Sequence, residues 1–181
     1  MKITSATILE VLSIERRIFA DVRGCLFKCF NQKAFNGATG LDVNFVQGNH
    51  SCSRKGVLRG LHYQLQQIQG KLVRVVQGEV FDVAVDIRKS SPTSGMGVNE
   101  LLPVDNKNQF GIPAGFAHAF SPCLITPNFW IKLLIIGRMR FERCIRCDNP
   151  QLGINWPTTI PPVVFAKDAV GNSFITADKF E

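Results

Sequence analysis

The sequence lacks any apolar run long enough to span a membrane. The longest candidate, residues 129–136, is interrupted by Lys132. The apolar stretch near the start, residues 8–12, contains Glu10 and makes a poor export signal. We therefore expect no membrane association and a cytoplasmic location. Apolar residues make up 45% of the chain and charged residues 19%, which is typical of a globular protein and excludes a disordered one.

A recognisable nucleic-acid-binding motif is also absent. The net charge is +7, but the basic residues are spread along the chain, with one cluster at residues 138–146. Proteins that bind nucleic acid usually concentrate basic residues on one face and add a motif. We therefore expect no nucleic-acid partner. A small phosphorylated ligand also explains isolated arginines at strand positions.

Helical periodicity is scarce. One short helix is predicted from Asn31, as its cap, to Thr39, with Gly40 as the stop. Nearly everything else reads as strands and turns, because β-branched and aromatic residues recur in short runs. The predicted strands are residues 57–64, 71–77, 80–87, 99–104, 109–112, 117–125 and 129–136. Gln77-Gly78, between two of these runs, predicts a tight hairpin.

Many short strands at close spacing predict an all-β fold, a double-sheet sandwich or barrel such as a jelly roll, with short peripheral helices. The 181 residues are enough for one ordinary domain and contain no convincing linker, so we expect a single domain over residues 1–181. In the 80–87 strand, alternation gives one fully apolar face and puts Asp82 and Asp86 on the other.

Six cysteines do not predict a disulfide framework, because the chain has no export signal. Cys144 and Cys147 have the C-x-x-C spacing of a zinc or redox pair, but no second pair with matching spacing accompanies them. Buried free thiols are the better interpretation of these residues.

The stretch 56–64, Gly-Val-Leu-Arg-Gly-Leu-His-Tyr-Gln, reads as a buried strand that carries an arginine and a histidine. Regular alternation puts Arg59 and Tyr63 on one face, and His62 and Gln64 on the other. A strand with such residues at core positions is either strained or functional. Taken alone, His62 would be interpreted as a hydrogen-bonded core histidine. Motifs elsewhere in the chain favour function.

Collinear motifs over almost the whole chain resemble the dTDP-4-dehydrorhamnose 3,5-epimerase family. They are Asp21-Val-Arg-Gly24, Asn49-His-Ser51, the 56–64 stretch, Gln69-Gly-Lys-Leu-Val-Arg74, Val80-Phe-Asp-Val-Ala-Val-Asp-Ile-Arg88, Ile112-Pro-Ala-Gly-Phe-Ala-His118 and Ala166-Lys-Asp168. The resemblance implies a cupin-type jelly roll and a homodimer. It also implies inversion of C3 and C5 of a dTDP-4-keto-6-deoxyhexose, in the route to dTDP-L-rhamnose.

The resemblance implies a role for each matching residue. His62 corresponds to the base, Asp168 to its orienting carboxylate, and Lys71 to a residue near the keto oxygen. These residue types suit the chemistry, since a proton next to a ketone is removed by a near-neutral base while a donor stabilises the oxyanion. The implied substrate ligands are Arg23, Gln47, Asn49, Arg59, His118 and Lys167.

The resemblance implies no metal ion and no other cofactor. His118 ends the pattern Pro-x-Gly-x-x-His, which supplies a ligand in metal-binding cupins, but those proteins also need His-x-His. This chain reads His62-Tyr-Gln64 at that point. We therefore expect His118 to line the pocket or to form a hydrogen bond.

One departure from the family bears directly on mechanism. The family's proposed acid is a tyrosine in Phe-Leu-Tyr-Lys, and this chain reads Phe129-Trp-Ile-Lys132, so Ile131 stands in its place. Tyr63 is the one tyrosine of the chain and is expected to point away from His62. Three alternatives stay open. Water or another donor returns the proton, with slower epimerisation or inversion of one carbon only; the pocket serves a different dTDP-sugar; or the chain is a non-catalytic dTDP-sugar-binding paralogue.

Overall fold

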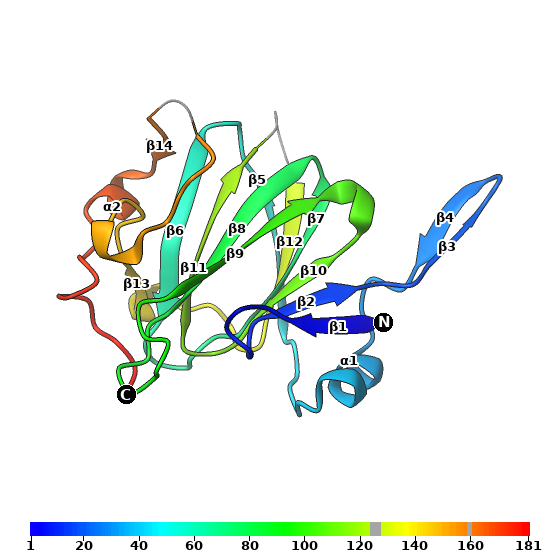
Figure 1. Ribbon diagram of the computed structural model, residues 1–181, viewed down its shortest axis with the longest axis horizontal. Coiled ribbons are helices and arrows are strands. Elements are labelled where there is room, and N and C mark those ends of the chain that lie inside the picture. Colours follow the sequence, from blue (N-terminus) through cyan, green and yellow to red (C-terminus); the bar gives the residue numbers. More distant parts are fainter. Residues whose placement is uncertain (124–127, 159–160) are drawn as a thin grey trace.

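Two β-sheets face one another in the computed structural model, which describes residues 1–123, 128–158 and 161–181 (Figure 1). The first sheet has the order β1 (Lys2–Ser5), β2 (Leu12–Glu15), β10 (Gln109–Ile112), β7 (Lys71–Gln77), β12 (Asn128–Leu133) and β5 (Gln47–Cys52). The second has the order β13 (Glu142–Cys144), β6 (Val57–Gln64), β11 (Phe116–Pro122), β8 (Glu79–Asp86) and β9 (Gly97–Pro103). A short strand, β14 (Val163–Val164), pairs in parallel with β6. This face-to-face arrangement is the double-sheet jelly roll predicted from the sequence.

Short helices lie at the edges of the two sheets. The α-helices are α1 (Gln32–Thr39) and α2 (Ala166–Ala169), and 3-10 turns cover Val104–Asn106, Met139–Phe141 and Pro150–Leu152. The side chain of Asn31 accepts a hydrogen bond from the amide of Ala34, and Gly40 ends α1 in the left-handed conformation. The predicted helix and its caps are therefore confirmed. Among the described residues, no helix is long and apolar enough to cross a membrane.

Apolar residues form a layer between the sheets and a layer on the outer face of each. Between the sheets, Val73 and Phe129 pack against Ala84 and Phe116. Residues of the C-terminal segment, including Leu152 and Phe180, cover the outer face of the second sheet. Phe35 of α1 covers part of the outer face of the first sheet. Because both faces of β8 are covered, its apolar face and its carboxylate face are both buried.

The predicted hairpin at Gln77-Gly78 is wrong. Strand β7 pairs with β10 and β12 in the first sheet, whereas β8 pairs with β9 and β11 in the second. The chain crosses from one sheet to the other at Gly78, which has a φ of 77°. A glycine between two strand-like runs therefore marks a corner here, because both edges of β7 are already paired within its own sheet.

Most of the predicted strands are found close to their predicted bounds. The bounds of β6, β7 and β10 match the prediction, and β8 and β9 differ from it by one or two residues. The predicted strand 117–125 corresponds to β11, which ends at Pro122, and positions 124 and 125 lie outside the described residues. The predicted strand 129–136 corresponds to β12, which ends at Leu133.

The regular alternation predicted for β6 is also wrong, and the difference shapes the site. His62 pairs with His118 of β11 and Arg59 pairs with Phe120, so the register shifts between these two pairs. Gly60, between them, has a φ of 109°. This irregularity turns Arg59 and His62, three residues apart, towards the same cavity.

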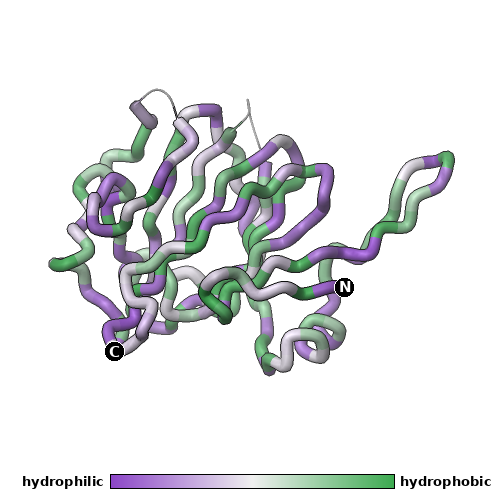
Figure 2. The backbone as a smooth tube through the Cα atoms, viewed as in Figure 1, coloured by the Kyte–Doolittle hydropathy of each residue, from purple (hydrophilic) through white to green (hydrophobic). Residues whose placement is uncertain are grey.

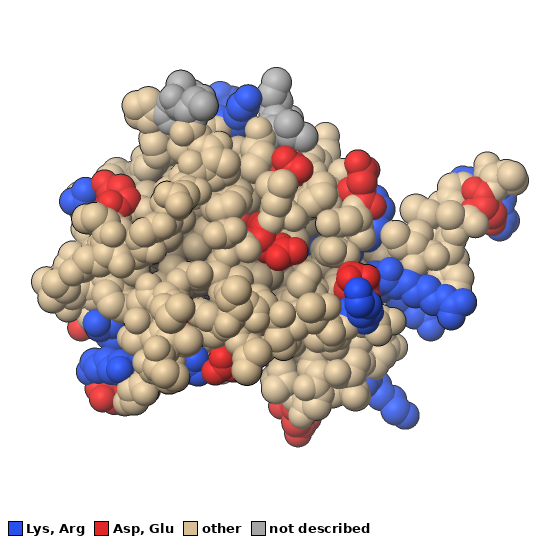
Figure 3. All heavy atoms as spheres, viewed as in Figure 1, with Lys and Arg blue, Asp and Glu red and all other residues tan. Residues whose placement is uncertain are grey.

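A two-stranded hairpin projects away from both sheets. It consists of β3 (Ile18–Asp21) and β4 (Gly24–Phe27), paired antiparallel (Figure 1). Hydrophobic stretches run along it (Figure 2), and Phe19, Val22 and Leu26 are exposed. Basic residues gather where it leaves the body (Figure 3). An isolated two-stranded hairpin is marginally stable in water, so this element needs a covering surface.

Gly60 provides a test of the β6 register. We expect Gly60→Ala to lower the free energy of unfolding by about 2 kcal/mol or more, since a Cβ would lie 2.4 Å from the carbonyl oxygen of His118 and the φ of 109° disfavours alanine. Gly37→Ala in α1 is the matched control, because a Cβ there meets nothing within 4 Å and alanine favours a helix. Urea unfolding of both variants tests the register, and equal stability of the two would contradict it.

Candidate active site

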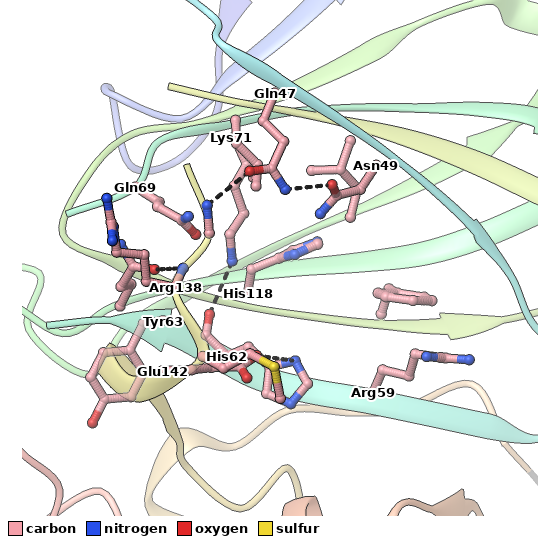
Figure 4. Close-up of a pocket in the computed structure, with 16 residues that line it drawn as sticks. Gln47, Asn49, Arg59, His62, Tyr63, Gln69, Lys71, His118, Arg138 and Glu142 are labelled. Atoms are coloured by element: carbon pink, nitrogen blue, oxygen red, sulfur yellow. Dashed lines mark hydrogen bonds and ion pairs between the residues drawn. The ribbon is translucent and has the colours of Figure 1, made fainter. Parts of the chain in front are cut away.

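A cavity of about 310 Å³ opens between the two sheets at the end where His62 lies (Figure 4). The first sheet contributes Gln47, Asn49, Lys71, Ile131 and Leu133 to its wall. The second sheet contributes Arg59, His62, Gln64, His118, Phe120 and Glu142. Its volume suits a small ligand, and its wall combines a few apolar side chains with many polar groups, as expected for a polar ligand.

His62 is held by a buried carboxylate. Its Nε2 atom lies 2.7 Å from Oδ1 of Asp168, which is 1% exposed and belongs to α2. The other oxygen of Asp168 accepts a hydrogen bond from the amide of Gly60 at 3.3 Å. Because a carboxylate only accepts hydrogen bonds, this contact places the proton of the neutral imidazole on Nε2. The lone pair on Nδ1 is then left to act as a base.

A second carboxylate lies on the Nδ1 side of His62. Oε1 of Glu142 is 3.9 Å from Nδ1, and Oε2 of Glu142 pairs with Nζ of Lys167 at 2.9 Å. Both carboxylates come from segments that follow β12 in the chain and pack back against β6. The imidazole is therefore positioned between two acids.

Lys71 enters the cavity from the first sheet and is 8% exposed. Its Nζ atom donates a hydrogen bond to the carbonyl oxygen of His62 at 3.0 Å (Figure 4). Burial lowers the pKa of Lys71 from 10.5 to about 8, although Asp82 and Glu142 oppose this shift. An ammonium group with this pKa is both a hydrogen-bond donor to an oxyanion and a usable proton donor.

His118 lies deeper in the cavity wall than His62. Its Nε2 atom is 2.9 Å from Oδ1 of Asp82, and both side chains are buried. Burial lowers the pKa of His118, with the opposing effect of Asp82 smaller than that of burial. The imidazole of His118 is therefore neutral near pH 7 and acts as a hydrogen-bonding group of the wall.

Polar side chains gather where the cavity meets β5. Nε2 of Gln47 donates to Oδ1 of Asn49 at 2.7 Å, and Oε1 of Gln47 accepts from the amide of Gly137 at 2.9 Å. Arg59, on the facing sheet, donates from Nε to the hydroxyl of Ser53 at 3.0 Å. These groups offer donors and acceptors for a polar ligand, with a guanidinium suited to an anion.

Ile131 lies in the cavity wall on the sheet that faces β6. It cannot donate a proton. Tyr63 borders the same cavity, but its side chain points away from the other labelled residues (Figure 4), and its hydroxyl donates to the carbonyl oxygen of Asp178 at 2.6 Å. Burial raises the pKa of Tyr63 to about 12. The expectation that Tyr63 points away from His62 is therefore confirmed.

Comparison with known proteins identifies the group to which this chain is related. The family model described as dTDP-4-dehydrorhamnose 3,5-epimerase matches residues 5–175. A curated protein of that name from Pseudomonas aeruginosa is 49% identical over 180 residues, which is 99% of each chain. The chain belongs to the dTDP-4-dehydrorhamnose 3,5-epimerase family.

Solved structures support the same relationship. A dTDP-6-deoxy-D-glucose-3,5-epimerase from Legionella pneumophila, in complex with dTDP-4-keto-L-rhamnose, matches with a TM-score of 0.95 and 44% identity. The match covers 98% of this chain and 94% of the Legionella chain. A 3'-monoepimerase from Streptomyces bikiniensis, in complex with dTDP-quinovose, has a TM-score of 0.89 and 28% identity, over 95% of this chain and 87% of its own. The fold is therefore similar both to a 3,5-epimerase and to a single-carbon epimerase.

Two of the residues that the family resemblance implies as substrate-binding lie outside the cavity between the sheets. Arg23 sits at the tip of the β3–β4 hairpin, is exposed, and pairs with Asp21. The structure does not bring it into the cavity of its own chain. Lys167 lies in α2 and lines a neighbouring cavity of about 250 Å³, together with His62 and Glu142. The remaining expected residues, His62, Lys71, Gln47, Asn49, Arg59 and His118, all line the first cavity, and Asp168 adjoins it through His62.

Several polar residues of the cavity wall were not predicted from the sequence, among them Gln64, Gln69 and Glu142. Gln64 accepts from the amide of Arg138 at 2.7 Å, and Gln69 donates to the carbonyl oxygen of Ile135 at 3.1 Å. Both glutamines belong to motifs quoted above, so they could have been proposed. Glu142 could have been noticed as the acidic residue within the basic cluster 138–146.

The cysteines bear on whether the site could hold a metal ion. Cys144 and Cys147 are free thiols, as expected, but only Cys147 of the two is buried, whereas Cys144 is partly exposed. Among the described residues, His62, Cys144 and Asp168 have ligand atoms within 4.8 Å of one another, the spacing of a metal site. The fit is poor, because His62 and Asp168 already bond to each other and burial raises the pKa of the Cys144 thiol to about 12. Metals bind the thiolate form, which this environment disfavours.

The lowered pKa of Lys71 has a consequence for stability. Between about pH 8 and pH 10.5 the unfolded chain keeps the lysine proton that the folded protein has lost. Stability therefore rises with pH over this range, by about 3 kcal/mol for this residue. We expect the free energy of unfolding of the protein to rise, relative to that of Lys71→Met, between pH 7 and pH 10. Urea titrations at both pH values measure the difference in free energy of unfolding between the two proteins. A difference that does not change with pH would contradict the lowered pKa of Lys71.

Proposed function

We propose that this protein inverts C3 and C5 of dTDP-4-keto-6-deoxyglucose, without a cofactor, as a dTDP-4-dehydrorhamnose 3,5-epimerase. The observation that carries the proposal is a histidine–carboxylate pair, His62 and Asp168, that opens into the same cavity as a buried lysine, Lys71. The family match over residues 5–175 and the curated relatives support the substrate and the reaction. Both favour the epimerase over a protein that binds the nucleotide sugar without turnover.

The reaction proceeds through an enolate. Each proton removed is adjacent to the C4 ketone, so the electron pair of the broken C–H bond enters the C–C bond and moves charge to the keto oxygen. His62 takes the proton on Nδ1, and Asp168 stabilises the imidazolium through Nε2. Lys71 donates a hydrogen bond to the developing oxyanion in a site largely shielded from water. Return of a proton on the opposite face gives the inverted carbon.

The polar part of the cavity wall supports a place for the nucleotide. Arg59 presents a guanidinium suited to the pyrophosphate, while Gln47 and Asn49 offer amide groups on the facing sheet. We assign His118, in the wall of the first cavity, to binding of the sugar. We assign Lys167 to binding of an anionic group at the neighbouring cavity. The cytoplasmic location expected from the sequence stays a prediction.

Inversion at one carbon only is the second candidate function. Ile131 favours it, because it lies on the cavity wall that faces His62 and offers no proton. The similarity to a 3'-monoepimerase shows that relatives with this fold act on a single carbon. Substrates that carry deuterium at C3 or at C5 separate the two candidates, since each carbon reports its own exchange.

The base assignment predicts that His62→Ala loses proton exchange and keeps ligand binding. We expect exchange at C3 and C5 to fall by at least ~100-fold, because the substitution removes the nitrogen that takes the proton. Binding of dTDP depends on the polar wall and should change little. NMR of the sugar protons and calorimetric titration of dTDP measure the two effects.

His50→Ala is the matched control for this variant. His50 lies on the edge strand β5, outside the cavity, and accepts a hydrogen bond from Trp130. We expect normal exchange in the control. Retained exchange in His62→Ala would rule out His62 as the base.

We further propose that the protein works as a homodimer in which each hairpin reaches the other subunit. Phe19, Val22 and Leu26 are exposed on an element that lacks cover within its own chain. Arg23 at its tip is a cation without a place in the cavity of its own chain. In the dimer, the partner subunit's Arg23 would meet the phosphates of the ligand, which reconciles its position with the role expected from the sequence.

Active-site complementation tests this arrangement. Arg23→Ala and His62→Ala should each show low activity alone. Mixed under conditions that exchange subunits, they should regain roughly a quarter of the sites, since half of the dimers then contain one intact site. Sedimentation should give a dimer for both variants. Failure of the mixture to regain activity while heterodimers form would contradict a shared site.

A further inference from the structure

The proton that restores the carbon on the opposite face needs a donor across the cavity from His62. Within the described cavity wall, the first sheet supplies Gln47, Asn49, Lys71, Ile131 and Leu133. Amide and aliphatic side chains do not transfer protons at neutral pH. Lys71 is therefore the one titratable group that the described part of this sheet offers to the cavity.

The other titratable groups of the cavity are poorly placed for this step. Glu142 lies beside Nδ1 of His62 and pairs with Lys167, and His118 is bound to the buried carboxylate of Asp82, so neither is free to deliver a proton to the other face of a ligand. The hydroxyl of Tyr63 is engaged with Asp178 beyond β6. Arg138 borders the cavity, but a guanidinium keeps its protons in proteins.

We propose that Lys71 is the proton donor of this protein and performs the role that Ile131 cannot perform. The proposal rests on the proposed function and deepens it. The stem of Lys71 enters from β7, the middle of the sheet facing β6, and spans the cavity to the carbonyl oxygen of His62 (Figure 4). One ammonium proton makes that bond. The ammonium group has two more protons, and Lys71 lines the cavity between the sheets.

The step balances without a co-reactant. His62 Nδ1 takes the proton from the carbon, and the C–H electron pair forms the enolate. The enolate then uses its C=C electron pair to take a proton from Lys71 Nζ, and the C4 carbonyl re-forms. Lys71 is left as a neutral amine and His62 as an imidazolium. Each returns to its starting state by exchanging a proton with water.

The titration of Lys71 fits a donor. Its pKa of about 8 leaves the ammonium form dominant near pH 7 and makes that form a far better acid than an exposed lysine. The charged and titratable groups that face it or share its cavities are Glu10, Arg59, His62, Tyr63, Asp82, His118, Arg138 and Glu142. Inversion should therefore decline as the pH rises through about 8.

The first test is Lys71→Arg, assayed with dTDP-4-keto-6-deoxyglucose in deuterated water. An arginine keeps the positive charge near the oxyanion but does not give up a proton. We expect inversion to fall by at least ~100-fold while deuterium still enters through His62 on the original face. The control is Lys132→Arg on the neighbouring strand β12, whose ammonium lies over Phe30 on the outer face of the same sheet. Normal inversion in Lys71→Arg would overturn the proposal.

The second test does not depend on whether Lys71→Arg folds. Ile131→Tyr places a phenol in the same wall of the otherwise unchanged protein, so a tyrosine with a pKa near 10 would share the donor role. We expect the alkaline decline of inversion to move from about pH 8 towards pH 10. An unmoved decline would overturn the proposal. Absence of any deuterium exchange in the unaltered protein would instead refute the proposed function.

Discussion

The hydrogen bond between Nε2 of His62 and Oδ1 of Asp168 is the contact on which the site depends. It joins residues 106 positions apart, one in β6 and one in α2. Asp168 is almost fully buried, and an unpaired carboxylate there would be costly, so the imidazole and the amide of Gly60 both stabilise it. The C-terminal segment supplies the carboxylate because its apolar residues cover the outer face of the second sheet. Packing of the fold and orientation of the His62 imidazole therefore rest on the same segment.

The two walls of the cavity differ chemically because the two facing sheets carry different side chains. The second sheet carries His62 and Glu142, and the first carries Lys71 and the amides of Gln47 and Asn49. An inversion needs one group to remove a proton and another to return it from the other side, which two facing walls provide. Ile131, which stands where the family resemblance implies a tyrosine, leaves Lys71 as the titratable side chain that the described part of the first wall offers. The fold is similar to that of both a 3,5-epimerase and a 3'-monoepimerase, so the same architecture accompanies inversion at one carbon or at two in these relatives.

Much of the fold could be predicted from the sequence, because the strands are short, rich in β-branched residues and bounded by turn residues. Six of the predicted site residues line the cavity, namely Gln47, Asn49, Arg59, His62, Lys71 and His118. Strand pairing could not be predicted, since Gln77-Gly78 has the local chemistry of a hairpin while the partners of β7 lie far along the chain. The shared face of Arg59 and His62 depends on a register shift against β11, which alternation within β6 does not reveal. The position of Arg23 depends on a hairpin that leaves the body of its own chain.

Proton exchange in the unaltered protein tests the central claim most directly. The protein is incubated with dTDP-4-keto-6-deoxyglucose in deuterated water, and the signals of C3 and C5 are followed by NMR. The account predicts deuterium at both carbons together with the inverted product. Bound dTDP without deuterium at either carbon would contradict it, and would mark the protein as one that binds the nucleotide sugar without converting it.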